Sequence, residues 1–400
     1  MRRGSKAKSV RIGSVLGPRF LHVPAPRAID AVDARASEAW SEEAEDLNVP
    51  LLHHRLPAIF IGRNIVTSLG RAAYRPFMRI LVVLPSWVGD AVMATPALGR
   101  LRRALPGAFI GGLCRPGIDE VLAGSGLLDE FHVERPTGVM GPKKTAAKVR
   151  PRRYDAALLL TNSFSTALVA RIAGIPRRVG YDRDGRGMLL TERLPAPKEG
   201  RGWAMVPAVN YYWRAVGGFL DANAGSARAE RPAGTLRGAV REHPQGAPPE
   251  LTHLPLETPP GVCMELGVTE AQRAIGEDVL RSAGIGEDEP FAVLNPGGNN
   301  PAKRWPAERF GAVAEALYER HGLRCVINGS PGEMDVLRAV QDAAPRSAPA
   351  ILAEHGITLG ALKHVCRRAA LMVTNDTGPR HIAAAFGTPV VSLFGPTDPR

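Results

Sequence analysis

The sequence has few cysteines and few aromatic residues, and both shortages exclude classes of protein. Its four cysteines, Cys114, Cys263, Cys325 and Cys366, are far apart and form no CxxC pair. Neither a zinc ribbon nor a disulfide-stapled scaffold is therefore predicted, and a reducing compartment is favoured. Aromatic residues make up only 6% of the chain. No RNP-like or helix-turn-helix signature accompanies them, which argues against a nucleic-acid partner.

Long apolar runs and low-complexity repeats are also missing. No window reaches the roughly 20 apolar residues that span a bilayer. The basic N-terminus lacks the apolar stretch of a secretory signal, so we expect a cytoplasmic protein. The 43 glycines and 35 prolines show no three-residue period, which excludes a collagen-like fibre. With 44% hydrophobic and 22% charged residues in 400 positions, the chain is globular and long enough for two or three domains.

The charge of the chain is strongly positive. Lys and Arg number 51 against 39 Asp and Glu, a formal net charge of +12. From Arg135 to Arg153 seven cations occur without one acidic residue. Such a run attracts nucleic acid, lipid headgroups or a phosphorylated substrate through the same screened Coulomb forces. A solvated loop that aids solubility is an alternative of equal weight.

Composition and the pattern of apolar residues divide the chain into four stretches. Residues 1–77 combine a basic start, an acidic middle and scattered prolines, which predicts a poorly ordered N-terminal extension. One hypothesis is that Met78 is the true initiator. Residues 78–220 and 262–400 each alternate apolar runs with helical patterns, which predicts parallel sheets with crossover helices. Residues 221–261 are rich in Ala, Gly, Arg and Pro and predict a linker or insertion.

The apolar runs define the expected strands. They lie at 80–84, 109–113, 156–160, 178–181, 291–295, 324–328, 371–374 and 390–394. Helices are expected at about 91–105, at 306–321, after Pro331, at 359–368 and from near Pro379. Two Rossmann-like halves with a cleft between them follow. Ligands in such folds bind beyond the carboxyl ends of the strands, so the loops after the strands are the places to inspect.

The first of these loops is PSWVGD, residues 85–90. Gly89 permits a tight turn, and Asp90 stands where a helix is expected to begin. Its carboxylate either caps free N–H groups, the more ordinary role of Asp at a helix start, or points into the cleft as a general base. The sequence position alone leaves both roles open.

The second loop is PGGNNPAKRWP, residues 296–306, which follows a strand and precedes a helix. Two glycines and two adjacent cations make it a plausible anion cradle. Backbone N–H groups, the helix dipole and the Lys303 ammonium can converge on a diphosphate. The Walker pattern GxxxxGK[ST] is absent. In the alternative interpretation Lys303 and Arg304 are exposed cations beside Trp305, which anchors the helix by packing.

The third loop is TNDTGPRH, residues 374–381, again between a strand and a helix. The N–H groups of Thr377 and Gly378 are expected to point at an anion, and Asp376 to accept hydrogen bonds from sugar hydroxyls. His381 lies one turn further. Alternatively, Asp376 or Thr377 only caps the helix and His381 packs.

Together these motifs resemble the ADP-heptose:lipopolysaccharide heptosyltransferases, glycosyltransferase family 9. The similarity covers about residues 78–400 and keeps the motif order PSWVGD, RVGYDRDGRGMLLT, PGGNNPAKRWP and NDTGPRHIAAAFGTPVVSLFGPTDP. The PSWVGD and AKRWP forms are most similar to the heptosyltransferase II branch. The resemblance implies an α/β fold of the GT-B type, with parallel sheets facing an interdomain cleft. It places the acceptor on residues 78–220 and the donor on residues 262–400.

The activity implied by the resemblance is an inverting transfer of the second inner-core heptose. The donor is ADP-heptose, and the acceptor is a heptosyl-Kdo-lipid A. The resemblance implies no metal and no cofactor, and no DxD pair ends an expected strand. A phosphorylated lipid acceptor gives the run Arg135–Arg153 a role at the inner face of the cytoplasmic membrane, where peripheral association is expected.

The resemblance also assigns residues to roles. Asp90 matches the family's proposed base, and Lys303 matches its diphosphate-binding lysine. Glu333, after the sequence GSPG, resembles the ribose-binding glutamate. The remaining expected substrate contacts are Gly89, Gly297, Asn299, Asp376, Thr377, Gly378 and His381.

Two other classes of function stay open. The same loops could hold a nucleotide sugar in a non-catalytic binding protein, in which Asp90 only caps. They could also serve another GT-B glycosyltransferase or an epimerase that uses a different nucleotide sugar. Family members usually continue past GPTDP, so either the chain is truncated at Arg400 or its hinge is built differently.

Overall fold

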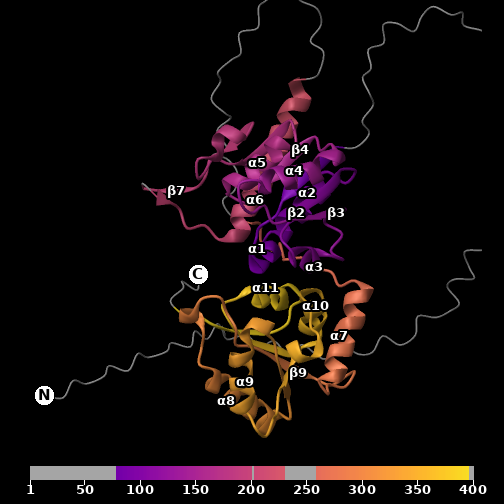
Figure 1. Ribbon diagram of the computed structural model, residues 1–400, viewed down its shortest axis with the longest axis vertical. Coiled ribbons are helices and arrows are strands. Elements are labelled where there is room, and N and C mark those ends of the chain that lie inside the picture. The colour runs from indigo at the N-terminus through magenta and orange to yellow at the C-terminus, as the bar shows by residue number, and fades with distance from the viewer. Residues whose placement is uncertain (1–77, 201, 230–257, 396–400) are drawn as a thin grey trace, which may run out of the picture. The chain divides into compact units, whose positions relative to one another are not determined.

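A computed structural model describes residues 78–200, 202–229 and 258–395. The expected extension at 1–77, most of the expected linker and the last five residues lie outside this part of the chain. Both sheets of the described part belong to one compact unit. Elements of the first sheet are indigo to magenta in Figure 1, and those of the second are orange to yellow.

The first sheet has six parallel strands in the order β3-β2-β1-β4-β5-β6. The strands are β1 (Arg79–Val83), β2 (Phe109–Cys114), β3 (Glu130–Val133), β4 (Ala156–Leu159), β5 (Arg177–Tyr181) and β6 (Glu192–Leu194). The four strands expected here are confirmed. The edge strands β3 and β6 were not predicted, because they are short and carry no apolar run. An antiparallel hairpin of β7 (Lys198–Glu199) and β8 (Gly202–Trp203) follows.

The helices of this first half depart from expectation in two places. They are α1 (Val88–Met93), α2 (Thr95–Ala104), α3 (Ile118–Leu122), α4 (Gly141–Val149), α5 (Phe164–Ile172) and α6 (Ala208–Ala229), with 3₁₀ turns η1 (Arg150–Arg152) and η2 (Arg186–Leu189). The helix expected at about 91–105 is two helices, because Pro96 cannot donate a helical hydrogen bond and sits at the start of α2. Residues 221–229 of the expected linker are helical, since α6 continues to Ala229.

The second sheet has five parallel strands in the order β11-β10-β9-β12-β13. The strands are β9 (Phe291–Asn295), β10 (Arg324–Ile327), β11 (Ala350–Ile351), β12 (Leu371–Asn375) and β13 (Val390–Leu393). The helices are α7 (Glu270–Ser282), α8 (Ala307–His321), α9 (Met334–Asp342), α10 (Leu359–Arg368) and α11 (Gly378–Ala385), with 3₁₀ turns η4 (Pro301–Lys303), η5 (Pro331–Glu333) and η6 (Leu352–His355). The four strands expected here are confirmed, and so are the helices at 306–321 and 359–368, to within a residue at each end.

Each sheet is buried on both faces. In β1, Ile80 and Val82 pack with α2 and α6, while Leu81 and Val83 pack with α4 and α5. Burial on both faces explains why the parallel strands read as continuous apolar runs. Val92 of α1 and Val121 of α3 join the hydrophobic cluster of the second sheet. The expected α/β fold with parallel sheets is confirmed.

The strand order reverses at one point in each sheet. In the first sheet the reversal lies between β1 and β4, and in the second between β9 and β12. Loops that leave such neighbouring strands go to opposite faces, and the crevice between them is where open α/β sheets bind ligands. The three loops singled out in the sequence follow β1, β9 and β12. The topology therefore places all three at these reversal points.

Candidate functional site

Asp90 is the third residue of α1 and not its cap. The helix begins at Val88, and its N-cap residue Trp87 makes no side-chain capping bond. Oδ1 of Asp90 instead accepts a hydrogen bond of 3.1 Å from the Tyr212 hydroxyl. Burial raises the pKa of Asp90, and the hydrogen bond from Tyr212 opposes this rise. A carboxylate with a raised pKa is better matched to proton abstraction than an ordinary surface aspartate.

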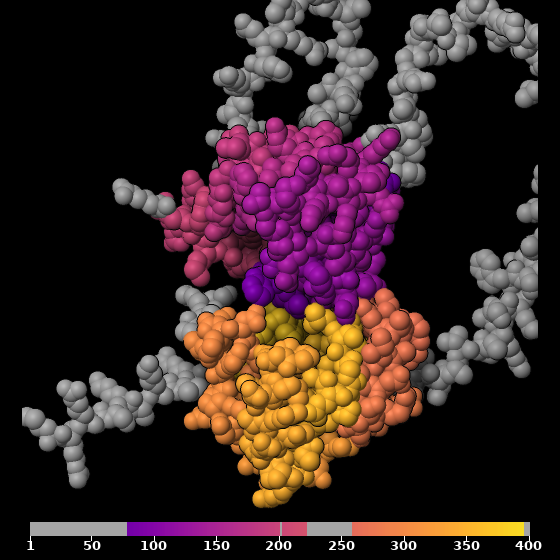
Figure 2. Space-filling view, in the orientation of Figure 1, coloured from indigo at the N-terminus to yellow at the C-terminus, as the bar shows by residue number. Residues whose placement is uncertain are grey.

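Two glycines bring α1 and α11 into direct contact. A Cβ atom on Gly89 would lie 2.8 Å from Cδ2 of His381, and one on Gly378 would lie 2.9 Å from Cβ of Val88. Helices α1 and α11 pack closely along this contact. Figure 2 shows indigo atoms from the α1 region against yellow atoms from near the end of the chain. The first and third predicted loops are therefore neighbours.

Asp376 lies between two cations. Its Oδ2 is 3.0 Å from Nζ of Lys303, and its Oδ1 is 3.0 Å from Nη2 of Arg380. Burial by itself raises the pKa of Asp376, but these cations outweigh burial and hold the pKa below its usual value. Lys303 belongs to the second loop and Asp376 to the third. An ion pair between protein side chains therefore joins the two loops.

His381 is an uncharged ring at neutral pH. Burial, together with the neighbouring Arg380 guanidinium, lowers the pKa of His381 to about 4. Nη2 of Arg380 lies 3.1 Å from Nε2 of His381. A guanidinium can only donate, so Nε2 accepts and the ring proton is assigned to Nδ1.

The start of α11 carries backbone N–H groups with no partner inside the helix. Its N-cap Thr377 makes no side-chain capping bond, and Pro379 occupies the first turn. The first N–H groups of a helix have no partner within the helix, so this end suits an anion. In the second loop, Asn300 accepts a 3.0 Å hydrogen bond from Ala302 N, while Asn299 is exposed.

Three asparagines at strand ends hold these loops, and none of them is among the site residues predicted from the sequence. Nδ2 of Asn295 donates to Oγ1 of Thr377 at 2.9 Å. Nδ2 of Asn328 donates to Oδ1 of Asn295 at 2.7 Å. Nδ2 of Asn375 donates to the carbonyl of Pro296 at 2.7 Å. All three are buried. The available signal was an asparagine closing each apolar run, since a buried amide needs a partner.

Glu333 supports the glycine turn of the second loop. Its Oε1 accepts from Gly298 N at 2.8 Å, and its Oε2 accepts from both the N and Oγ of Ser330. A Cβ atom on Gly297 would overlap Oε1. Burial raises the pKa of Glu333, but these hydrogen bonds outweigh burial and lower it. Both oxygens hold the loop here, so a contact with ribose stays a prediction.

The basic run divides into paired and unpaired cations. Lys148 pairs with Glu134, and Arg152 pairs with Glu130. Lys143 and Lys144 are exposed on α4 and have no ion-pair partner among the described residues. The preceding Val139 and Met140 are 97% and 51% exposed. Arg135, Arg150 and Arg153 also lack an ion-pair partner among the described residues, so uncompensated cations flank α4 as well as lying at its start, where two exposed apolar side chains are adjacent.

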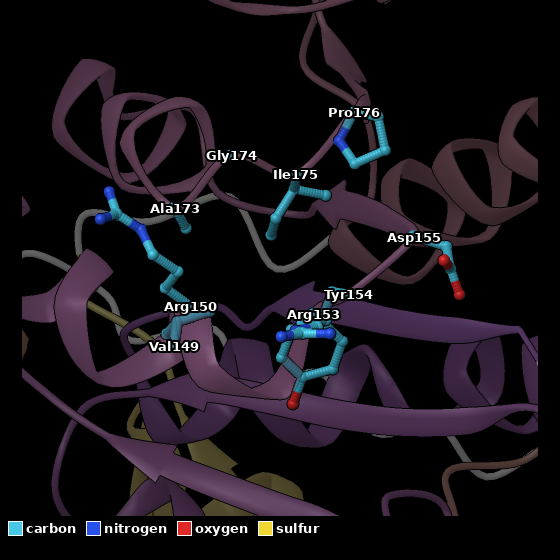
Figure 3. A pocket seen from close by; sticks show the side chains of 9 residues that line it. All are labelled: Val149, Arg150, Arg153, Tyr154, Asp155, Ala173, Gly174, Ile175 and Pro176. Carbon is cyan, nitrogen blue, oxygen red and sulfur yellow. The ribbon is translucent and has the colours of Figure 1, made fainter.

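A separate pocket of about 270 Å³ lies near the amino ends of β4 and β5 in the first sheet (Figure 3). It is lined by residues 149–150, 153–155 and 173–176, and none of the predicted site residues is among them. Tyr154 and Asp155 precede β4, while Ile175 and Pro176 precede β5. The pocket is thus at the amino ends of the strands, away from the edge where α/β sheets bind ligands.

The described residues hold neither a metal-binding cluster nor a membrane-spanning helix. They contain no group of three or more His, Cys, Asp or Glu side chains arranged to hold a metal ion. None of their helices has the length and apolar character needed to cross a membrane.

Comparisons with known proteins point to one family. Residues 143–216 and 249–400 match the model of glycosyltransferase family 9 (heptosyltransferase). The chain is 28% identical over 340 residues to lipopolysaccharide heptosyltransferase 2 of Escherichia coli K12, covering 80% of this chain and 84% of that protein. It is 26% identical over 336 residues to lipooligosaccharide heptosyltransferase 2 of Haemophilus influenzae, covering 81% of this chain and 85% of that protein.

Solved structures agree with this result. The structure of Escherichia coli ADP-heptose LPS heptosyltransferase II matches with a TM-score of 0.62 and 26% identity, covering 80% of this chain and 86% of that chain. A glycosyltransferase family 9 protein from Veillonella parvula matches with a TM-score of 0.63 and 22% identity, covering 81% of this chain and 82% of that chain. The second likeness concerns the fold alone.

Proposed function

Because the chain belongs to glycosyltransferase family 9, the heptosyltransferases, we propose that it moves a heptose from ADP-heptose onto the inner core of lipopolysaccharide. The acceptor is a heptosyl-Kdo-lipid A, and the heptose added is the second. Similarity along 80% of the chain to heptosyltransferase 2 of Escherichia coli supports this acceptor. The observation that carries the proposal is the contact of Gly89, which precedes Asp90 in α1, with Gly378 and His381.

The two halves divide the substrates between them. Residues 78–220 hold the acceptor, and residues 262–400 hold the donor. Asp90 takes the proton of an acceptor hydroxyl while that oxygen bonds to the anomeric carbon of the heptose. The bond from this carbon to the diphosphate breaks on the opposite face, and its electron pair leaves with ADP, so the configuration inverts. The raised pKa of Asp90 supports its role as the base.

The departing ADP carries the developing negative charge. Lys303, the first N–H groups of α11 and the turn at Gly297 balance this charge, because fixed donors cost no reorganisation during the reaction. Thr377 and Gly378 bind a phosphate, Asp376 and His381 face the heptose, and Asn299 and Glu333 contact the nucleotide. The transfer in this proposal uses no metal ion.

The acceptor places the enzyme at a membrane. Its sugars are anchored by lipid A, so the reaction takes place at the inner face of the cytoplasmic membrane, with the protein bound peripherally. Lys143 and Lys144 supply attraction to anionic lipid headgroups. Val139 and Met140, exposed beside them, enter the interfacial region.

The direct test is product formation. Purified chain is incubated with ADP-heptose and a monoheptosylated Kdo-lipid A, and the lipid is weighed by mass spectrometry. A gain of one heptose supports the proposal. ADP binding without any product would favour the non-catalytic binding protein. Equal competition by UDP and ADP would favour another GT-B enzyme or an epimerase.

The role of Asp90 separates an enzyme from a binding protein. Asp90→Asn keeps the size of the side chain and removes the base, so turnover is expected to fall about 10²-fold or more while ADP binding is retained. Asp278→Asn serves as the control, because Asp278 is exposed and pairs with Arg281 of its own helix. Turnover that is equal in the two variants would remove Asp90 from the mechanism.

A further inference from the structure

The segment RVGYDRDGRGMLLT, residues 178–191, has no role in the transfer described above, yet it contains a fully buried arginine. Arg186 is 0% exposed. Its Nε donates to the carbonyl of Tyr181 at 3.0 Å, its Nη2 donates to Oδ1 of Asn162 at 3.3 Å, and its Nη1 donates to the carbonyl of Thr161. Burial lowers its pKa to about 10, so the guanidinium stays charged at neutral pH. A buried charge with its donors engaged fixes the groups around it.

Asn162 links the buried Arg186 to α6. The same Oδ1 atom accepts a 3.0 Å hydrogen bond from the Tyr211 hydroxyl. The Tyr211 ring stacks on Tyr181 with centroids 4.1 Å apart, and the Tyr181 hydroxyl donates to the carbonyl of Tyr211 at 2.8 Å. Asn162 follows β4, and Tyr181 ends β5. The first turn of α6 is therefore held by the ends of two strands.

The next residue of α6 reaches the proposed base. Consecutive helical residues point about 100° apart, so Tyr212 points away from Asn162 and toward α1. Tyr212 is 7% exposed, and its hydroxyl donates to Oδ1 of Asp90 at 3.1 Å. Asp90 follows β1 and Asn162 follows β4, on the two sides of the strand reversal. Helix α6 thus connects both sides through adjacent tyrosines.

We propose that Tyr212 is a positioning residue for the transfer: it holds Oδ1 of Asp90 so that Oδ2 is the oxygen presented to the acceptor hydroxyl. Arg186, Asn162 and Tyr211 fix the helical turn that carries Tyr212. This inference rests on the proposed function, in which Asp90 is the base. A carboxylate held at one oxygen keeps the other in a defined direction, and the direction of a base affects the rate strongly.

The surroundings of Asp90 set the expected pH dependence. The elements packed against α1 are α2, α3, α6 and α11. The charged and titratable groups among their described side chains are Arg100, Arg102 and Arg103 on α2, Asp119 and Glu120 on α3, Tyr211, Tyr212, Arg214 and Asp221 on α6, and Arg380 and His381 on α11. Of these, Tyr212 is hydrogen-bonded to the carboxylate. Burial raises the pKa of Tyr212 further above its usual value, so it remains a donor throughout the working range.

The test is Tyr212→Phe, which keeps the ring and removes the hydroxyl. The expected kcat is about tenfold to hundredfold lower, with the KM for ADP-heptose unchanged. The hydroxyl lowers the pKa of Asp90, so its loss raises that pKa and moves the acid limb of the kcat profile to higher pH. Replacing Tyr212 with 3-fluorotyrosine, a stronger donor, is expected to move the limb to lower pH.

Tyr154→Phe is the matched control. Tyr154 is 4% exposed, and its hydroxyl forms a 2.8 Å hydrogen bond with the side chain of His132. His132 lies in β3, an edge strand of the first sheet. The Tyr154→Phe variant is expected to retain the kcat of the parent protein and the position of the acid limb in its pH profile. If Tyr212→Phe has the same kcat and the same acid limb as Tyr154→Phe, the inference is overturned. If Tyr212→Phe does not fold, an unmoved acid limb in the fluorotyrosine protein overturns it instead. Failure of the proposed function is distinct, because then Asp90→Asn itself retains turnover.

Discussion

Lys303 and Asp376 form an ion pair, with 3.0 Å between Nζ and Oδ2, although they lie in different loops of the second sheet. Their side chains are 27% and 16% exposed. In the proposed function the donor diphosphate becomes the partner of Lys303. Asp376 keeps its second cation, Arg380. In that proposal Asp376 holds the lysine in place for an incoming anion.

Replacing this lysine tests the arrangement. Lys303→Met removes the charge and is expected to raise the KM for ADP-heptose about 30-fold, because a hydrogen bond to a charged group contributes about 2 kcal/mol. Steady-state kinetics with varied donor measure the change. Arg338→Met, which removes an exposed cation paired with Glu354, should leave the KM as it is. An unchanged KM in Lys303→Met would contradict the role.

The contact at Gly89 is tested by adding one methyl group. Gly89→Ala places Cβ 2.8 Å from Cδ2 of the half-buried His381 ring, and overpacking of this kind costs about 1–3 kcal/mol. We expect a lower melting temperature and a lower kcat, because α1 must move away from α11. At Gly332 an added Cβ has no neighbour closer than 4.0 Å, so Gly332→Ala is the control. Equal melting temperatures in the two variants would argue against a tight contact.

His381 predicts a pH dependence of stability. Its pKa in the folded protein is about 4, below the unfolded value of about 6.5. The unfolded chain therefore binds more protons between these values, and folding stability falls as pH decreases from about 6.5 to about 4. His381→Gln should flatten this part of the curve. Thermal melting of both proteins across this range measures the difference. Parallel curves would show that His381 is not the group responsible.

The cations of α4 are expected to differ in their contribution to membrane binding. Changing Lys143 and Lys144 to Glu should weaken binding to anionic vesicles, more strongly at low salt than at high salt. Lys148→Glu is a control from the same helix, because Lys148 is already paired with Glu134. Co-sedimentation with phosphatidylglycerol vesicles gives the comparison. Equal binding by the double variant and the parent protein would exclude this surface.

The charge balance proposed for the donor site predicts that a chelator has no effect. With Lys303 and the start of α11 neutralising the diphosphate, heptose transfer should proceed at the same rate in EDTA. The rate is measured by product mass with and without the chelator. Loss of turnover in EDTA, restored by added Mg²⁺, would disprove this part of the mechanism.

The sequence predicted the central strands and the edge strand β13, but not the edge strands β3, β6 and β11. The runs that became β1 and β9 are apolar throughout, and a run of that kind is stable only between two layers of helix. β3 and β6 pair on one side only and include charged residues, so no apolar run marks them. Residues 221–229 were assigned to a linker by composition, yet they extend α6.

For the candidate site, the sequence alone indicates which loops to consider, because glycines and polar residues directly after apolar strands lie at the ligand-binding end of a parallel sheet. The partners of those residues, in contrast, depend on the three-dimensional fold. The hydrogen bond between Tyr212 and Asp90 joins positions 122 residues apart, and the lysine of one loop meets the aspartate of another. Such contacts depend on how strands are ordered and helices packed, and the local periodicity of a sequence records neither.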